Sequence, residues 1–245
     1  MRTPSSPTPS PRTPDASGTS QGVTVGLLLV TAPTLPAAVL WDMDGTLVDT
    51  EPFWMRAEYR LAAEYGGEWT EGDGLHIVGS GLLDAAEYLK TRVPTPLTAP
   101  EVVDYLKAEV VAALELDIPW QPGALDLIEA YRALGVPQAL VTMSYADVAA
   151  PVAAVARFDA IVTGDLDLPP KPHPDPYLRA AEMLGVDAAD CLAVEDSPTG
   201  ASSANAAGCF VIGVPHAVDV PPAERRVVLP TLADQTPQTL AALVS

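Results

Sequence analysis

The chain has 245 residues, enough for one sizeable domain or for a core domain with a smaller insertion. Its formal net charge of −19 repels nucleic-acid phosphates and the anionic cytoplasmic face of membranes, so neither is an expected partner. A small phosphorylated substrate is compatible with this charge, because a bound cation and a few local donors can reverse the sign of the potential inside one site.

The first part of the sequence, residues 1–34, is rich in Pro, Ser and Thr. Such a composition buries too little apolar surface to offset the entropy lost on ordering, and we expect a disordered leader. The apolar run at residues 23–30 is far shorter than the roughly 20 residues that a transmembrane helix needs. A signal peptide is the alternative for this run, and a start codon placed too far upstream would also account for the leader.

The apolar run at residues 37–41 predicts a buried strand. Apolar side chains at helical spacing then predict helices over residues 51–65, about 82–89 and about 100–114. Residues 70–81 are rich in Gly and lack a clear pattern, so no element is expected there. Residues 52–119 are therefore expected to form a compact helical block without a strand.

From residue 120 the pattern changes to alternating strands and helices. Strands are expected at residues 138–142, 160–163, 191–194 and 210–214, and helices at about 124–134, 146–156, 175–185 and 200–207. Short apolar strands that alternate with helices predict a parallel sheet buried on both faces. The fold class is thus α/β, with a core at 35–51 and 120–245 and a helical insertion at 52–119.

Four of the predicted strands end in, or are followed by, polar side chains that can take part in catalysis or binding. These residues are, in chain order, Asp42 and Asp44, then Thr142 and Ser144, then Lys171, and finally Glu195 and Asp196. Taken singly, each has an ordinary role as a turn residue, a helix cap or a solvated lysine. Ligands of open α/β sheets bind beyond the carboxyl ends of the strands, so the joint occurrence of these residues there predicts one site.

This set suits phosphoryl transfer. The carboxylates need a hard cation, and oxygen ligands indicate Mg²⁺ held by Asp42, Asp44, Glu195 and Asp196. The phosphate is expected to contact Asp42, Thr142, Ser144 and Lys171. One Asp can act as nucleophile and form an acyl phosphate, while the other protonates the leaving oxygen and later activates water.

The motifs Asp42-Met43-Asp44-Gly45-Thr46-Leu47, the strand that ends in Thr142, Lys171-Pro172-His173-Pro174 and Glu195-Asp196-Ser197 resemble those of the haloacid dehalogenase-like superfamily. The resemblance covers about residues 37–215 and is to the Mg²⁺-dependent phosphatase and phosphomutase branch. It implies a Rossmann-like core and makes residues 52–119 a small cap that closes over the site.

The resemblance also implies roles for the site residues. Asp42 would be nucleophile and Mg²⁺ ligand, and Asp44 the general acid/base that binds Mg²⁺ through its backbone carbonyl. Thr142 and Lys171 would hold the phosphate and Asp42. Asp196 would ligate Mg²⁺, with Glu195 in or near that shell.

The leading interpretation is a hydrolase of a small phosphate monoester, such as a sugar phosphate or a phosphoglycolate-like compound. A phosphomutase of the β-phosphoglucomutase kind shares the core residues and is the alternative, although Thr46 after Asp44-Gly45 favours a phosphatase in the family pattern. Dehalogenation is disfavoured, because it uses one Asp and no metal cluster. A non-catalytic binding protein on this fold is expected to lose a motif, and all four are intact.

Two further expectations concern the setting of the enzyme and its specificity. The cysteines, Cys191 and Cys209, lie in apolar stretches and are expected to be reduced core residues of a cytoplasmic monomer or small homo-oligomer. The candidates for substrate selection in the insertion are Trp69, His76, Gly79 and Ser80. The alternative for these is a packed Trp and an incidental His.

Overall fold

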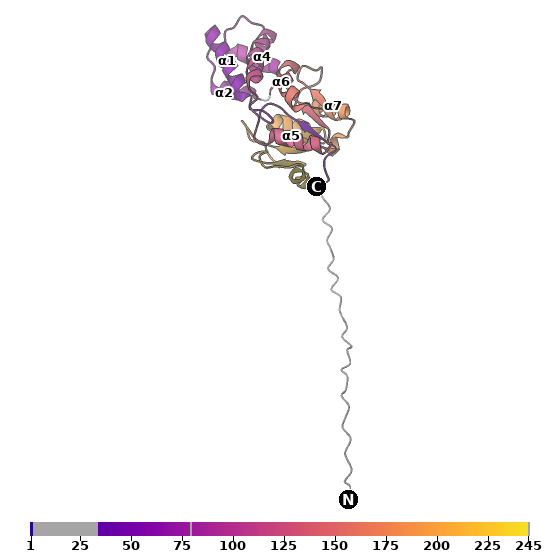
Figure 1. Cartoon of the computed structure of the whole chain (residues 1–245). Helices are drawn as coiled ribbons and strands as arrows, with labels where there is room; N and C mark the ends of the chain where they lie inside the picture. The colour runs from indigo at the N-terminus through magenta and orange to yellow at the C-terminus, as the bar shows by residue number, and fades with distance from the viewer. Residues whose placement is uncertain (2–33, 79, 245) are drawn as a thin grey trace. The chain divides into compact units, whose positions relative to one another are not determined.

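The computed structural model describes Met1, residues 34–78 and residues 80–244, so nearly all of the expected leader lies outside the described residues. Its centre is a sheet of six strands in the order β3-β2-β1-β4-β5-β6, with every neighbouring pair parallel. Figure 1 shows helices packed around the strands. The strands are β1 (Ala38–Trp41), β2 (Gln138–Val141), β3 (Ala160–Val162), β4 (Cys191–Glu195), β5 (Phe210–Gly213) and β6 (Arg226–Val228). The predicted parallel sheet is confirmed, and β6 adds a strand in a tail where none was expected.

Both faces of the sheet are buried under helices. Val39 and Trp41 of β1 join one apolar cluster, whereas Ala38 and Leu40 join another on the opposite face. The first cluster contains residues of α5 (Ala124–Ala133), α6 (Ala146–Ala156) and α9 (Pro237–Leu243). The second contains residues of α7 (Asp175–Leu184) and α8 (Pro198–Ala206). Burial on two sides explains why the strands are continuously apolar instead of alternating.

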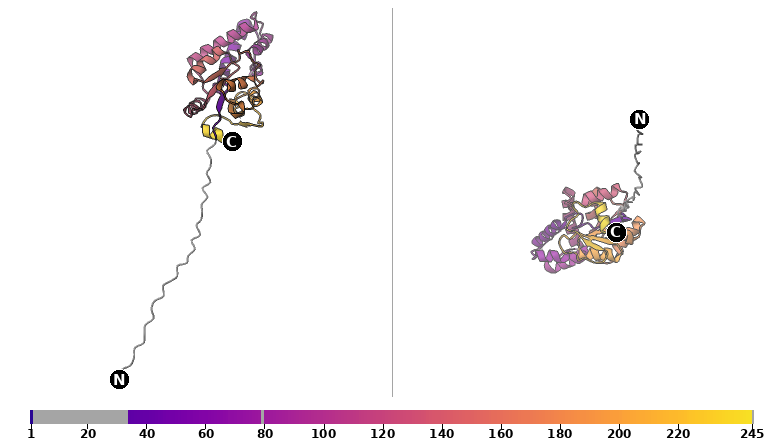
Figure 2. Two further views of the ribbon diagram at one scale, coloured as in Figure 1. Left: turned by 90° about the vertical axis from the view of Figure 1, so that its right-hand side faces the viewer. Right: turned by 90° about the horizontal axis from the view of Figure 1, so that it is seen from below.

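In the described residues between β1 and β2 there are five helices, and the first four share a core of their own. They are α1 (Glu51–Tyr65), α2 (Glu71–Ile77), α3 (Leu82–Arg92) and α4 (Ala99–Leu116). Leu61 of α1, Leu89 of α3 and Leu106 of α4 meet in this apolar cluster. Figure 2 shows these indigo to magenta helices gathered together, away from the strands. The predicted helical cap is confirmed, and none of the helices in the described residues is long and apolar enough to cross a membrane.

Residues 70–81 differ from expectation, because α2 forms there. A capping box begins this helix: the Thr70 hydroxyl accepts a hydrogen bond from the Asp73 amide, and the Asp73 carboxylate accepts one from the Thr70 amide (3.0 Å). Gly72 and Gly74 lower the intrinsic helix propensity of this segment, which is why no helix was expected there. The Thr-x-x-Asp spacing was the signal that could have revealed it.

The cap is also tied to the core through α4. The Lys107 ammonium donates to the Asp147 carboxylate at the start of α6 (2.9 Å). The same ammonium lies 5.0 Å from the centroid of the Tyr145 ring, a cation–π contact. These contacts hold one side of the cap against the carboxyl edge of the sheet.

Candidate active site

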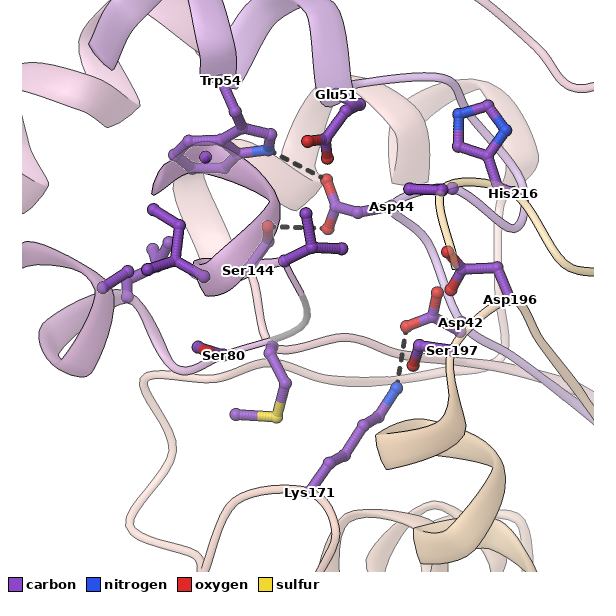
Figure 3. Close-up of a pocket in the computed structure, with 18 of the residues that line it drawn as sticks. Asp42, Asp44, Glu51, Trp54, Ser80, Ser144, Lys171, Asp196, Ser197 and His216 are labelled. Carbon is purple, nitrogen blue, oxygen red and sulfur yellow. Dashed lines mark hydrogen bonds and ion pairs between the residues drawn. The ribbon is translucent and has the colours of Figure 1, made fainter. Parts of the chain in front are cut away.

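Asp42 directly follows β1 and accepts a hydrogen bond on each carboxylate oxygen. Lys171 Nζ donates to its Oδ1 (2.7 Å), and the Thr46 hydroxyl donates to its Oδ2 (2.8 Å). Lys171 also donates to the Val141 carbonyl at the end of β2 (2.9 Å) and to Glu195 Oε1 (2.6 Å). Burial disfavours the ammonium, but the carboxylates of Asp42 and Glu195 more than offset it and hold the pKa of Lys171 above its usual range. Lys171 is therefore a buried cation that points at Asp42 (Figure 3).

Asp44 is held by four donors. Its Oδ1 accepts from the Thr50 hydroxyl (2.6 Å) and the Trp54 indole N–H (3.3 Å). Its Oδ2 accepts from the hydroxyls of Ser144 (2.8 Å) and Thr142 (3.2 Å). Burial raises the pKa of Asp44, and the bond from Thr50 opposes this only in part. The carboxyl is thus fixed between the start of α1 and the end of β2.

Three buried carboxylates lie within reach of one cation. One side-chain oxygen each from Asp42, Glu195 and Asp196 lies within 4.8 Å of the others. Burial, and then the charge of Asp42, raise the pKa of both Glu195 and Asp196. Lys171 balances one of the three negative charges and leaves two. An all-oxygen donor set with this excess charge fits Mg²⁺.

Two glycines allow the backbone to pass close to these acids. Gly45 has φ of 85°, and a Cβ there would lie 2.2 Å from Asp196 Oδ2. A Cβ at Gly200 in α8 would lie 1.9 Å from Glu195 Oε1. Any larger residue would therefore push a carboxylate out of the cluster.

The acidic edge opens into a pocket that the cap covers. The core side of its lining includes Asp42, Asp44, Ser144, Lys171 and Asp196. The cap side includes Glu51, Trp54, Glu58, Ser80, Leu82 and Leu106. Figure 3 shows Glu51 and Trp54 on one side of Asp44, with Asp42 and Lys171 on the other. A ligand in this pocket would touch both the core and the cap.

The four cap residues that the sequence analysis proposed for substrate selection lie in different places. Ser80 lines the pocket. Trp69 is buried and donates its indole N–H to Glu58 Oε2 (2.9 Å). His76 is exposed, packs on the Tyr88 ring and is not part of the pocket lining. Gly79 lies outside the described residues.

Comparison with known proteins decides the family. A family model for haloacid dehalogenase-like hydrolases matches residues 36–208, a range that contains all seven predicted site residues. The chain belongs to the haloacid dehalogenase-like hydrolases. The enzyme class and the resemblance of the motifs are thereby confirmed.

Relatives of this hydrolase include known phosphatases. Hexitol phosphatase A of Escherichia coli (strain K12) is 31% identical over 186 residues, which cover 74% of this chain and 84% of that protein. The bifunctional riboflavin kinase/FMN phosphatase of Arabidopsis thaliana is 34% identical over 189 residues, but the match spans only 49% of that longer protein.

The fold also matches solved structures of CbbY from Rhodobacter sphaeroides. The complex with phosphate has a TM-score of 0.71 and 27% identity, and the match covers 82% of this chain and 96% of that chain. A mutant of the same protein was solved with xylulose-(1,5)bisphosphate and gives the same TM-score of 0.71.

The motifs did not reveal every residue that builds this site. Thr50 and Trp54 hold Asp44, and the Tyr177 hydroxyl donates to Glu195 Oε1 (2.6 Å) while its ring lies 5.1 Å from Lys171 Nζ. Each lies at the start or in the first turns of a helix that follows a site loop. Polar-tipped side chains at such positions were the available signal.

Proposed function

We propose that this hydrolase is a Mg²⁺-dependent phosphatase that cleaves a small phosphate monoester, such as a sugar phosphate or a phosphoglycolate-like compound, through an aspartyl phosphate. The observation that carries the proposal is Asp42 itself. It is a buried carboxylate at the pocket wall, paired with Lys171 and less than 5 Å from two further acids. The names of the relatives support phosphorylated small molecules as substrates.

The proposed reaction has two steps. A carboxylate oxygen of Asp42 attacks phosphorus, the ester P–O bond breaks, and Asp44 gives its proton to the departing oxygen. A water then attacks the phosphorus of the acyl phosphate, and Asp44 takes the proton from that water. Phosphate leaves, and Asp42 regains its carboxylate.

The remaining residues bind and orient the phosphoryl group. Lys171 pairs with Asp42 and supplies positive charge to the phosphate oxygens. The Thr142 and Ser144 hydroxyls donate to Asp44 in the structure, and we propose that they turn to the phosphate when it binds.

Mg²⁺ would be held by Asp42, Asp196 and the Asp44 backbone carbonyl, with Glu195 beside them. When bound, it would neutralise charge on the phosphoryl oxygens in the transition state. Glu195 already binds Lys171 and Tyr177, which favours a place for it behind the direct ligands.

The proposal extends to the organisation of the protein. We propose that residues 35–51 and 120–245 form the core domain and residues 52–119 the cap, because α1–α4 share a separate apolar cluster. Cys191 and Cys209 are both free and buried, which agrees with reduced core residues. We also propose a cytoplasmic enzyme that is a monomer or a small homo-oligomer.

The test is phosphate release from an aryl phosphate with Mg²⁺, together with mass spectrometry of Asp42→Asn after incubation with substrate. The wild type should release phosphate, and Asp42→Asn should neither turn over nor carry a phosphate adduct. An adduct on this variant, or wild-type activity, would mean that another residue is the nucleophile. Conversion of a sugar phosphate to its isomer without phosphate release would establish the phosphomutase alternative.

A further inference from the structure

The cap side of the pocket carries acidic side chains. Glu51 and Glu58 of α1 both line it. Among the described residues of the lining, Lys171 is the only Lys or Arg, and two carboxylates already pair with it. His216 also lines the pocket, where its Nε2 lies 3.0 Å from the Asp49 carboxylate. An anionic group at the cap end of a ligand would therefore find no free cation among these side chains.

The basic residues of the cap are placed elsewhere. The sequence has five Lys or Arg residues between 52 and 119: Arg56, Arg60, Lys90, Arg92 and Lys107. None of them lines the pocket. Arg60, Arg92 and Lys107 form ion pairs with Glu109, Asp73 and Asp147, respectively. The basic side chains of the cap thus lie outside the pocket.

Glu58 is the best-placed cap residue to contact a ligand. It is 5% exposed, and its Oε2 accepts the indole N–H of Trp69. The backbone of α2 packs beside it, because a Cβ at Gly74 would lie 3.3 Å from Oε2. Within the described part of the chain, no donor bonds to the other oxygen, Oε1. Oε1 is not among the enclosed side-chain atoms that lack a partner, so it stays accessible where Glu58 lines the pocket. A ligand that brings a donor can therefore form a charge-assisted hydrogen bond with it.

We propose that this pocket selects phosphate monoesters with a single phosphoryl group whose other end presents an O–H or N–H donor to Glu58, and that it discriminates against bisphosphates. The inference rests on the proposed phosphatase function and narrows its substrate class. A polyol or an amino alcohol would supply the same donor chemistry. A bisphosphate would place a second anion against Glu51 and Glu58.

The test is run at about pH 8.5, above the pKa of about 7 of Glu58, so that this carboxylate is ionised. It compares esters of one chain length: hexyl phosphate, a hexitol monophosphate, aminohexyl phosphate and a hexitol bisphosphate. An aryl phosphate serves as the reference for the chemistry alone. Wild-type kcat/KM should be about tenfold higher for the hexitol monophosphate or the aminohexyl phosphate than for hexyl phosphate, as expected for one hydrogen bond to a charged group. It should be lower for the bisphosphate than for the monophosphate.

Glu58→Gln should remove most of this preference, measured as the ratio of kcat/KM for the hexitol monophosphate to that for hexyl phosphate. The matched control is Glu64→Gln, an exposed Glu on the same helix outside the pocket, which should keep the wild-type preference. The comparison of esters with the wild-type enzyme needs no variant. It therefore tests the predicted preference even if Glu58→Gln does not fold.

The two proposals fail in different ways. Aryl phosphate hydrolysis combined with a bisphosphate as good as the monophosphate overturns the inference alone. The inference alone is also overturned if kcat/KM is equal for hexyl phosphate and the hexitol monophosphate in the wild type and stays equal in Glu58→Gln. Absence of hydrolysis of every ester, the aryl phosphate included, overturns the proposed function and this inference with it.

Discussion

Glu58 is expected to make the protein less stable as the pH rises, and Glu58→Gln is expected to remove that dependence. Burial is the largest influence on this carboxyl and outweighs the opposing bond from Trp69, so the pKa of Glu58 rises from 4.5 to about 7. The folded protein then binds the Glu58 proton more tightly than the unfolded chain does. The resulting stabilisation is complete below pH 4.5 and is lost as the pH rises through 7.

The size of this effect follows from the difference between the two pKa values. The difference between about 7 and 4.5 is about 2.5 units, and at about 1.4 kcal/mol per unit it amounts to about 3 kcal/mol. A Gln side chain has the same shape, can still accept the Trp69 indole N–H and does not titrate. The free energy of unfolding of Glu58→Gln, minus that of the wild type, should therefore grow by about 3 kcal/mol between about pH 4 and about pH 8.

The assay is urea unfolding followed by circular dichroism at a series of pH values across that range. Buried acids such as Asp44 and Asp196 titrate in both proteins, so the subtraction removes their contribution. Glu64→Gln is the matched control, because Glu64 is exposed on the same helix, and its difference from the wild type should stay flat. A flat difference for Glu58→Gln as well would refute the argument that burial sets the pKa of this carboxyl.

Three other predictions test the site. Chelation by EDTA should abolish phosphate release, Mg²⁺ should restore it and Ca²⁺ should support it poorly; full activity in EDTA would exclude a metal mechanism. Asp44→Asn should slow turnover by about 10²–10⁴-fold and leave a long-lived phosphate adduct on Asp42, whereas a variant with the wild-type rate would remove Asp44 from acid–base catalysis. Gly200→Ala should lower both the melting temperature and the activity, because its Cβ would lie 1.9 Å from Glu195 Oε1. A loss of about 1–3 kcal/mol is expected from such overpacking, and unchanged melting would show that Glu195 can move aside.

Much of the core was predictable because it depends on local pattern. Continuous apolar runs specify strands that are buried on both faces, and the polar residues that end them mark the carboxyl edge of a parallel sheet. That rule alone brings Asp42, Lys171, Glu195 and Asp196 together, and the structure does place them in contact or close proximity. Elements without strong periodicity, such as α2 and β6, were not predicted.

The particular hydrogen-bond partners were decided only by the tertiary structure. Thr142 and Ser144 donate to Asp44, about 100 positions earlier in the chain, and no local pattern specifies which acid a hydroxyl will meet. The charge of the pocket likewise depends on how α1 and α2 pack. That packing buries Glu58 against Trp69 and pairs Arg92 with Asp73 in an ion pair. Composition counts the acids and bases of the cap, but only packing determines which of them face a ligand, because burial and pairing are set by contacts between distant segments.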